Sequence, residues 1–264
     1  MCCFSGPVVH VTGTRIFARC TGHGTQMLAY AMHVSAKDDV AMVLPLPVPP
    51  RSPETAVRFV SLEAYPELFD DLQRAFPELP SFGVSGGFAP QALRSVPKLV
   101  VHQVGAYEAS FVPTLADFDR LDRRFRLAPE VWDALPEYAD HGFAVFKLKG
   151  FSRGLRNLFQ RQPEPREFHP MAFEFPMRDP EAIFFPTVHV HDGAVHPDAT
   201  FGHELYAQAP FALDETWRRS DGPTSLYVSP ARAVGLVDGD APVYRRSLYG
   251  TLPNRDVWVR RRRA

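Results

Sequence analysis

The chain has 264 residues, of which 45% are hydrophobic and 22% charged, and its formal net charge is −1. This composition is typical of a globular protein with a substantial core, and it excludes a largely disordered chain. The near-neutral charge argues against a dedicated nucleic-acid binder, which would be clearly basic. The 26 prolines are about twice the usual share of ~5%, so long uninterrupted helices are not expected.

Three segments near the N-terminus have the composition of β-strands: Val8–Ala18, Gln26–Val34 and Val40–Leu46. The glycine-rich stretch CTGHGT between the first two predicts a hairpin turn. A short strand over Ala56–Leu62 follows. The next segment, Tyr65–Phe76, has apolar residues at helical spacing and predicts one amphipathic helix.

The middle of the chain begins with Pro80–Pro97, which is rich in glycine and proline and is expected to be a loop. A long β-prone run, Lys98–Val112, comes next. Two helical patches are predicted at Leu115–Phe125 and Pro129–His141, since proline suits a first helical turn. The chain then returns to a strand at Phe143–Leu148.

The last part of the chain starts with the basic segment Gly150–Arg166, interpreted as a connection or a short surface helix. Strands are predicted again at Phe168–Phe175 and Ala182–His191. Alternating β segments with few helices predict an α+β fold built on mainly antiparallel β-sheet with a few short helices. We expect a single globular domain over residues 1–264, the alternative being two β-rich halves that meet near residue 150.

Four of the ten histidines lie in the segment 187–203, which reads TVHVHDGAVHPDATFGH. Side chains alternate faces along a strand, so His189 and His191 share one face. Asp192-Gly193 is a strong signal for a two-residue type I′ hairpin. If the chain turns there, His196 lies opposite His189, and three imidazoles share a face.

Three imidazoles so arranged suit a transition metal such as copper, zinc or iron. His203 follows on a short strand and is a candidate fourth ligand or general base. Two alternatives remain open. A longer loop through Pro197 would separate His196 from His189, or the histidines are simply a solvated hairpin face.

The cysteines offer a second chemistry. Removal of Met1 would leave Cys2 with an α-amino group that acts as a base toward its own thiol. In placing cysteine at position two, the start resembles the N-terminal-nucleophile hydrolases, which implies hydrolase or acyltransferase activity with Cys2 as nucleophile. The structural alternative is that Cys2 and Cys3 pack as small hydrophobes. Cys20 and His23 form a further, weak ligand pair.

Several segments resemble an uncharacterised bacterial family, a domain of unknown function found mostly in predicted secreted proteins. The resemblance rests on the strand TRIFA near an N-terminal cysteine, on Asp39–Pro47 (DVAMVLPLP), on Leu135–Leu148 (LPEYADHGFAVFKL) and on Phe168–Phe175 (FHPMAFEF). It implies a single globular architecture and no known activity. The histidine segment is not part of it.

Three classes of function follow. The first is a metal-dependent enzyme, oxidative or hydrolytic, with His189, His191, His196 and His203 as ligands and a small molecule or peptide as substrate. The second uses Cys2 as nucleophile. The third is a non-enzymatic binding module with its long loops as the recognition surface. No secretory signal or membrane span is recognised, so we expect a cytoplasmic protein with no membrane or nucleic-acid partner.

Overall fold

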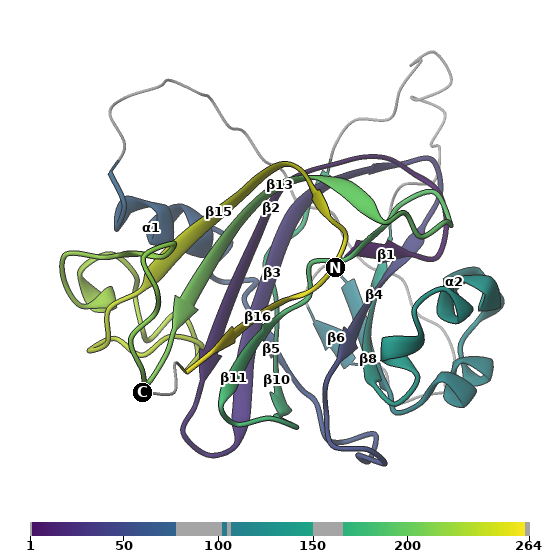
Figure 1. Ribbon diagram of the computed structural model, residues 1–264, viewed down its shortest axis with the longest axis horizontal. Coiled ribbons are helices and arrows are strands. Elements are labelled where there is room, and N and C mark those ends of the chain that lie inside the picture. Colours follow the sequence, from purple (N-terminus) through teal and green to yellow (C-terminus); the bar gives the residue numbers. More distant parts are fainter. Residues whose placement is uncertain (1, 78–101, 105–106, 150–165, 262–264) are drawn as a thin grey trace.

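The computed structural model describes residues 2–77, 102–104, 107–149 and 166–261, without the side chains of residues 2 and 167. Two large β-sheets dominate these residues (Figure 1). The strands of the six-stranded sheet are β1 (Cys2–Phe4), β4 (Val40–Leu46), β6 (His102–Val104), β7 (Tyr107–Val112), β8 (Gly142–Leu148) and β12 (His189–Val190). Their order across the sheet is β12-β1-β4-β8-β7-β6.

The second sheet has eight strands, namely β2 (Val8–Cys20), β3 (Thr25–Ala36), β5 (Arg58–Ser61), β9 (Arg166–Glu167), β10 (Met171–Pro176), β13 (Asp198–Gln208), β14 (Arg218–Arg219) and β15 (Tyr244–Pro253). Their order is β14-β15-β13-β2-β3-β10-β5, and β9 pairs with β3 beside this path. A separate antiparallel pair consists of β11 (Ala182–Phe185) and β16 (Val257–Arg260). Both large sheets take strands from each side of residue 150.

The described helices are short. They are the α-helices α1 (Leu68–Arg74) and α2 (Pro129–Asp133) and the 3₁₀ helices η1 (Leu115–Arg120), η2 (Arg123–Phe125), η3 (Pro136–Tyr138) and η5 (Thr224–Leu226). The helical patch predicted at Pro129–His141 is divided at Pro136, which cannot continue an α-helix. None of the helices in the described part of the chain is long and apolar enough to cross a membrane.

Strand β3 lies at the centre of the fold and is almost entirely buried, because both faces of its sheet are covered. Ile16 and Leu28 belong to the core shared with the six-stranded sheet. Phe17 and Ala29, one residue along each strand, belong to a second core under α1 and residues 228–243. Figure 1 shows α1 beside the eight-stranded sheet, at the opposite end of the molecule from α2. The alternation of strand side chains thus supplies two cores from one sheet.

Much of the predicted element order is confirmed. Strand β4 has the predicted bounds, and β2, β3, β5 and α1 lie where strands and a helix were expected. The predicted loop Pro80–Pro97 and most of the connection Gly150–Arg166 lie outside the described residues. The α+β class with few short helices agrees with the structure, but the sheets are mixed: β13 runs parallel to β2, and β1 runs parallel to β12.

The strand predicted over Ala182–His191 is wrong as one element. It is divided into β11, which pairs with β16, and β12, which pairs with β1. Pro186 has no backbone N–H and cannot continue a ladder. The next two backbone N–H groups, those of Thr187 and Val188, donate to the carboxylate of Asp256 instead.

Gln26 connects β3 to β11 through its side chain. Its amide nitrogen donates to the carbonyl oxygen of Phe184 at 2.7 Å, and its amide oxygen accepts from the N–H of the same residue at 2.9 Å. Gln26→Met keeps the length of this buried side chain but leaves both backbone groups unpaired, so we expect a loss of about 2–4 kcal/mol in unfolding free energy. Urea denaturation measures it, and an unchanged midpoint at equal slope would contradict the assignment.

Candidate functional site

Three histidines, His189, His191 and His203, meet between the two large sheets; we call them the histidine cluster. His189 begins β12, and its Cα partner on the parallel strand β1 is Cys2. His203 lies on β13 within the eight-stranded sheet, in register with Thr14 of β2. Segments near the N-terminus and near residue 200 therefore build one site.

The rings of the cluster pack on one another and on phenylalanine. His189 stacks on His191, with ring centroids 4.9 Å apart, and on Phe201 at 4.5 Å. His203 meets the ring of His189 nearly edge-on at 4.8 Å. The ring of Phe4, from β1, lies 5.8 Å from that of His191. The imidazoles are thus enclosed largely by aromatic carbon.

The polar contacts of these rings are few. The Nε2 atoms of His189 and His203 lie 3.0 Å apart, so one of them carries the proton and donates to the other. The Nε2 of His191 and the Nδ1 of His203 are buried without a hydrogen-bond partner among the described residues. An unsatisfied buried polar group of this kind costs about 1–3 kcal/mol, which makes the cluster unusual for a purely structural core.

Burial sets the protonation state of the cluster. Desolvation lowers the pKa of His189 to about 3, that of His191 to about 4 and that of His203 to about 2. The neighbouring imidazoles lower the pKa values of His189 and His203 further, because each would repel a second positive charge. All three rings are therefore neutral near pH 7, with a lone pair on one nitrogen of each ring.

The turn between β15 and β16 fixes the position of β12, the strand that begins at His189. Asn254 accepts from the backbone N–H of His189 at 2.7 Å and donates to the carbonyl oxygens of His189 and His196. One oxygen of Asp256 accepts from two N–H groups just before β12, and the other accepts from the hydroxyl of Tyr138 at 2.6 Å. No local sequence pattern indicates these residues, since only the folded chain brings them within reach of His189.

The predicted hairpin at Asp192-Gly193 is wrong. Gly193 does turn with a positive φ of 82°, but the residues after it do not pair back onto β12. Strand β13 begins at Asp198 and pairs with β2 and β15 instead. His196 is therefore exposed and bonds to the Asp192 carboxylate at 2.9 Å, away from His189. The cluster contains His189, His191 and His203, and the expected ligand His196 is not part of it.

The cysteines show no activated thiol among those described. Cys3 is fully buried in the core between the sheets. Burial raises the pKa of the Cys20 thiol to about 11, so it stays protonated at neutral pH. Cys2 is described only by its backbone, and its role as nucleophile stays a prediction. Across the described residues, no three or more histidine, cysteine, aspartate or glutamate side chains are arranged to hold a metal ion together.

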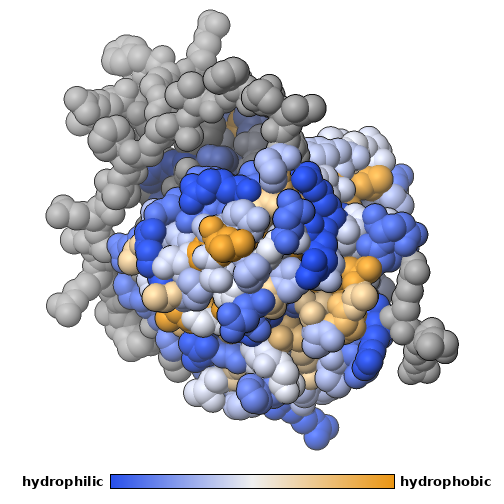
Figure 2. Space-filling view, turned by 90° about the vertical axis from the view of Figure 1, so that its left-hand side faces the viewer, coloured by the Kyte–Doolittle hydropathy of each residue, from blue (hydrophilic) through white to orange (hydrophobic). Residues whose placement is uncertain are grey.

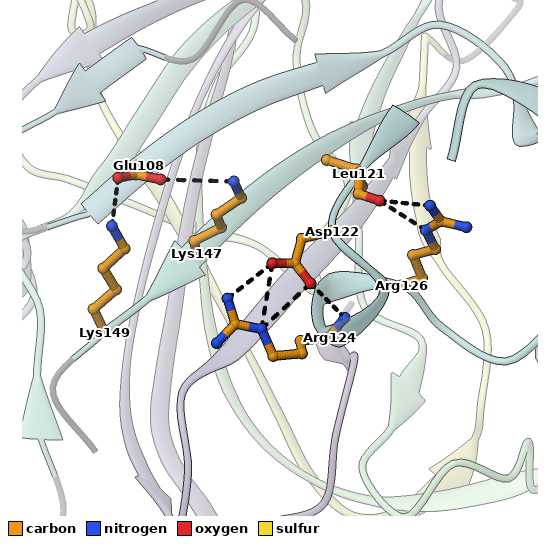
Figure 3. Close-up of polar contacts among 7 residues, drawn as sticks. All are labelled: Glu108, Leu121, Asp122, Arg124, Arg126, Lys147 and Lys149. Carbon is orange, nitrogen blue, oxygen red and sulfur yellow. Dashed lines mark hydrogen bonds and ion pairs between the residues drawn. The ribbon is translucent and has the colours of Figure 1, made fainter. Parts of the chain in front are cut away.

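A second set of polar residues lies on and beside β7, β8 and η2 (Figure 3). Glu108 lies between Lys147 and Lys149 and forms an ion pair with each. Asp122 is bonded to the guanidinium and the backbone N–H of Arg124, which hold the pKa of that carboxyl at about 2. Both carboxylates already form ion pairs with lysine or arginine side chains. These residues are therefore better suited to stabilising the local structure than to proton transfer.

The surface of the described residues has isolated apolar side chains. The large ones with the greatest exposure are Leu226, Val234, Tyr249 and Trp258. Figure 2 shows one face of the molecule, on which apolar patches are small and separated by hydrophilic residues. Single exposed apolar residues are normal and do not define an interface.

The similarity of this chain to known proteins lies in its fold. No family model matches the chain, and no curated protein matches it either. The architecture is shared with a viral protein of solved structure, at a level of identity that shows the fold alone.

That protein is baculovirus P35. Its crystal structure matches with a TM-score of 0.50 and 12% identity, over 99% of this chain and 100% of P35. A mutated baculovirus P35 after caspase cleavage matches with a TM-score of 0.44 and 13% identity, over 96% and 99% of the two chains. P35 in complex with caspase-8 matches with a TM-score of 0.45 and 12% identity, over 95% and 96%. The resemblance to a bacterial family is not tested by these matches and stays a prediction.

Proposed function

We propose that this protein is a binding module whose partner is a cysteine protease of the caspase class. The observation that carries the proposal is the likeness of fold to baculovirus P35, which extends over 99% of this chain. P35 has been seen after caspase cleavage and in complex with caspase-8. This is the third of the function classes considered from the sequence, with the partner now given a chemical class.

The packing of the fold supports a binding role. A module of this kind needs a rigid scaffold to present its binding segment. The two cores on either side of β3 supply such a scaffold.

The test is inhibition of a purified caspase, beginning with caspase-8, on a fluorogenic peptide. We expect an equimolar amount of this protein to reduce the activity at least tenfold and to co-elute with the protease in size-exclusion chromatography. The matched control is the same protease with its catalytic cysteine alkylated, which should bind far more weakly if the active site is engaged. Full protease activity at a tenfold excess of this protein, without a complex, would overturn the proposal.

A further inference from the structure

The histidine cluster is not explained by a protease-binding role, because His203 lies inside the fold and His189 and His191 are only partly exposed. His203 is 1% exposed, and its Nδ1 has no hydrogen-bond partner among the described residues. The same is true of the Nε2 of His191. A buried ring nitrogen left without a partner calls for a specific explanation. A bound ion would supply one for the Nε2 of His191, whereas the Nδ1 of His203 would carry the proton of that ring when its Nε2 binds the ion.

The donor chemistry of the cluster is that of a nitrogen-preferring metal. The cluster consists of three imidazole rings that lie against one another. Neutral imidazole is the form that binds metal ions, and it suits zinc and copper. The surrounding rings of Phe4 and Phe201 form a hydrophobic shell of the kind that limits the access of water to a metal site.

Two of the nitrogens are already close to ligand spacing. The Nε2 atoms of His189 and His203 are 3.0 Å apart. Two nitrogens bound to one zinc ion at ~2.0–2.1 Å in a tetrahedral arrangement lie roughly 3.4 Å apart. Replacing the present hydrogen bond with two metal bonds therefore requires three changes: a widening of a few tenths of an ångström, a turn of both rings so that their Nε2 lone pairs face one ion, and transfer of the proton from the donor Nε2 to the Nδ1 of the same ring.

We propose that the histidine cluster binds one zinc or copper ion through the Nε2 atoms of His189 and His203, with His191 as third ligand. In the described residues no three donor side chains are already arranged to bind one metal ion, so His191 must turn its ring to become the third ligand. Rotation about χ2 of histidine is broad and inexpensive, and the ring now stacks on His189 without a partner for its Nε2. The remaining position is left for a solvent ligand.

The experiment titrates Zn²⁺ alone, and Co²⁺ as a spectroscopic probe, into untagged protein stripped with a chelator. We expect about one equivalent to bind, with a rise in the midpoint of thermal unfolding. His189→Gln should weaken binding at least tenfold. The matched control is His196→Gln, which changes an exposed histidine of the same segment outside the cluster and should bind as the unchanged protein does.

A second measurement covers the case in which His189→Gln does not fold. X-ray absorption at the zinc edge of the unchanged protein should show scattering from two or three imidazoles. Absence of stoichiometric binding, equal binding by His189→Gln and the unchanged protein, or a zinc shell without imidazole would each overturn the proposal. Caspase inhibition is measured separately, so the two proposals stand or fail independently.

Discussion

Acidification of the metal-free protein from pH 6.5 to pH 4 is expected to destabilise the fold steeply. The folded-state pKa values of His189, His191 and His203 are lowered by burial to about 3, 4 and 2, whereas unfolded histidine titrates near ~6.5. At a pH between the folded and unfolded pKa values, these histidines are protonated in the unfolded chain and neutral in the folded chain. The stability is therefore present above pH 6.5 and is lost as the pH falls toward 4.

The size of this effect follows from proton linkage. Each histidine protonated only in the unfolded state lowers the unfolding free energy by about 1.4 kcal/mol per pH unit. Three such groups give a slope of up to about 4 kcal/mol per pH unit in the middle of the window. Burial also lowers the pKa values of His141 and His169, which act in the same direction. Urea denaturation at pH 7.5, 6, 5.5 and 5 measures the slope.

A variant isolates the share of the cluster. His191→Phe keeps an aromatic ring against His189 and Phe4 but removes one titrating group, so the slope should fall by about one proton. An identical slope for His191→Phe and the unchanged protein would contradict the assignment of the acid lability to the cluster.

The histidine segment shows what local pattern can and cannot predict. Strand alternation predicted that His189 and His191 lie together, and their rings do stack. The ring of His203 meets that of His189, and the role of these residues as metal ligands stays a prediction. Asp192-Gly193 has the sequence of a hairpin turn, but turn propensity is worth less than the long pairing of β13 with β2 and β15. For this reason His196 does not lie opposite His189, as the predicted hairpin required.

Other parts of the site depend on contacts between distant residues. The parallel pairing of β1 with β12 joins residues 2 and 189, and no local pattern specifies it. In the sequence, Phe4 and Phe201 have no feature that separates them from other core residues. In the structure, their rings contact His191 and His189. By contrast β4, whose apolar run is followed by prolines, was predicted with its observed bounds because both signals are local.

Asp256→Ala is expected to be among the most destabilising single changes in this protein, at about 3–5 kcal/mol of unfolding free energy. The carboxylate accepts from the N–H groups of Thr187 and Val188, at 2.7 and 3.1 Å, and from the hydroxyl of Tyr138 at 2.6 Å. All three donor residues are almost fully buried. Alanine leaves the three donors without an acceptor, which is the costly way to lose a hydrogen bond.

Two further variants separate the parts of this contact. Tyr138→Phe removes one donor together with its need for a partner, so it should cost about 1 kcal/mol. Asp256→Asn keeps an oxygen for the two N–H groups and should fall between Tyr138→Phe and Asp256→Ala. Unfolding in urea measures all three, and a cost below 1 kcal/mol for Asp256→Ala would contradict the assignment.

The same aspartate links stability to the cluster. Thr187 and Val188 directly precede His189, so loss of their acceptor frees β12, which carries His189 and is followed directly by His191. Asp256→Ala should therefore accelerate amide hydrogen exchange at residues 187 and 188 more than in α1, which packs in the other core. Equal acceleration in both places would mean that the variant lowers global stability alone. Local acceleration would identify the β15–β16 turn as the element that positions β12.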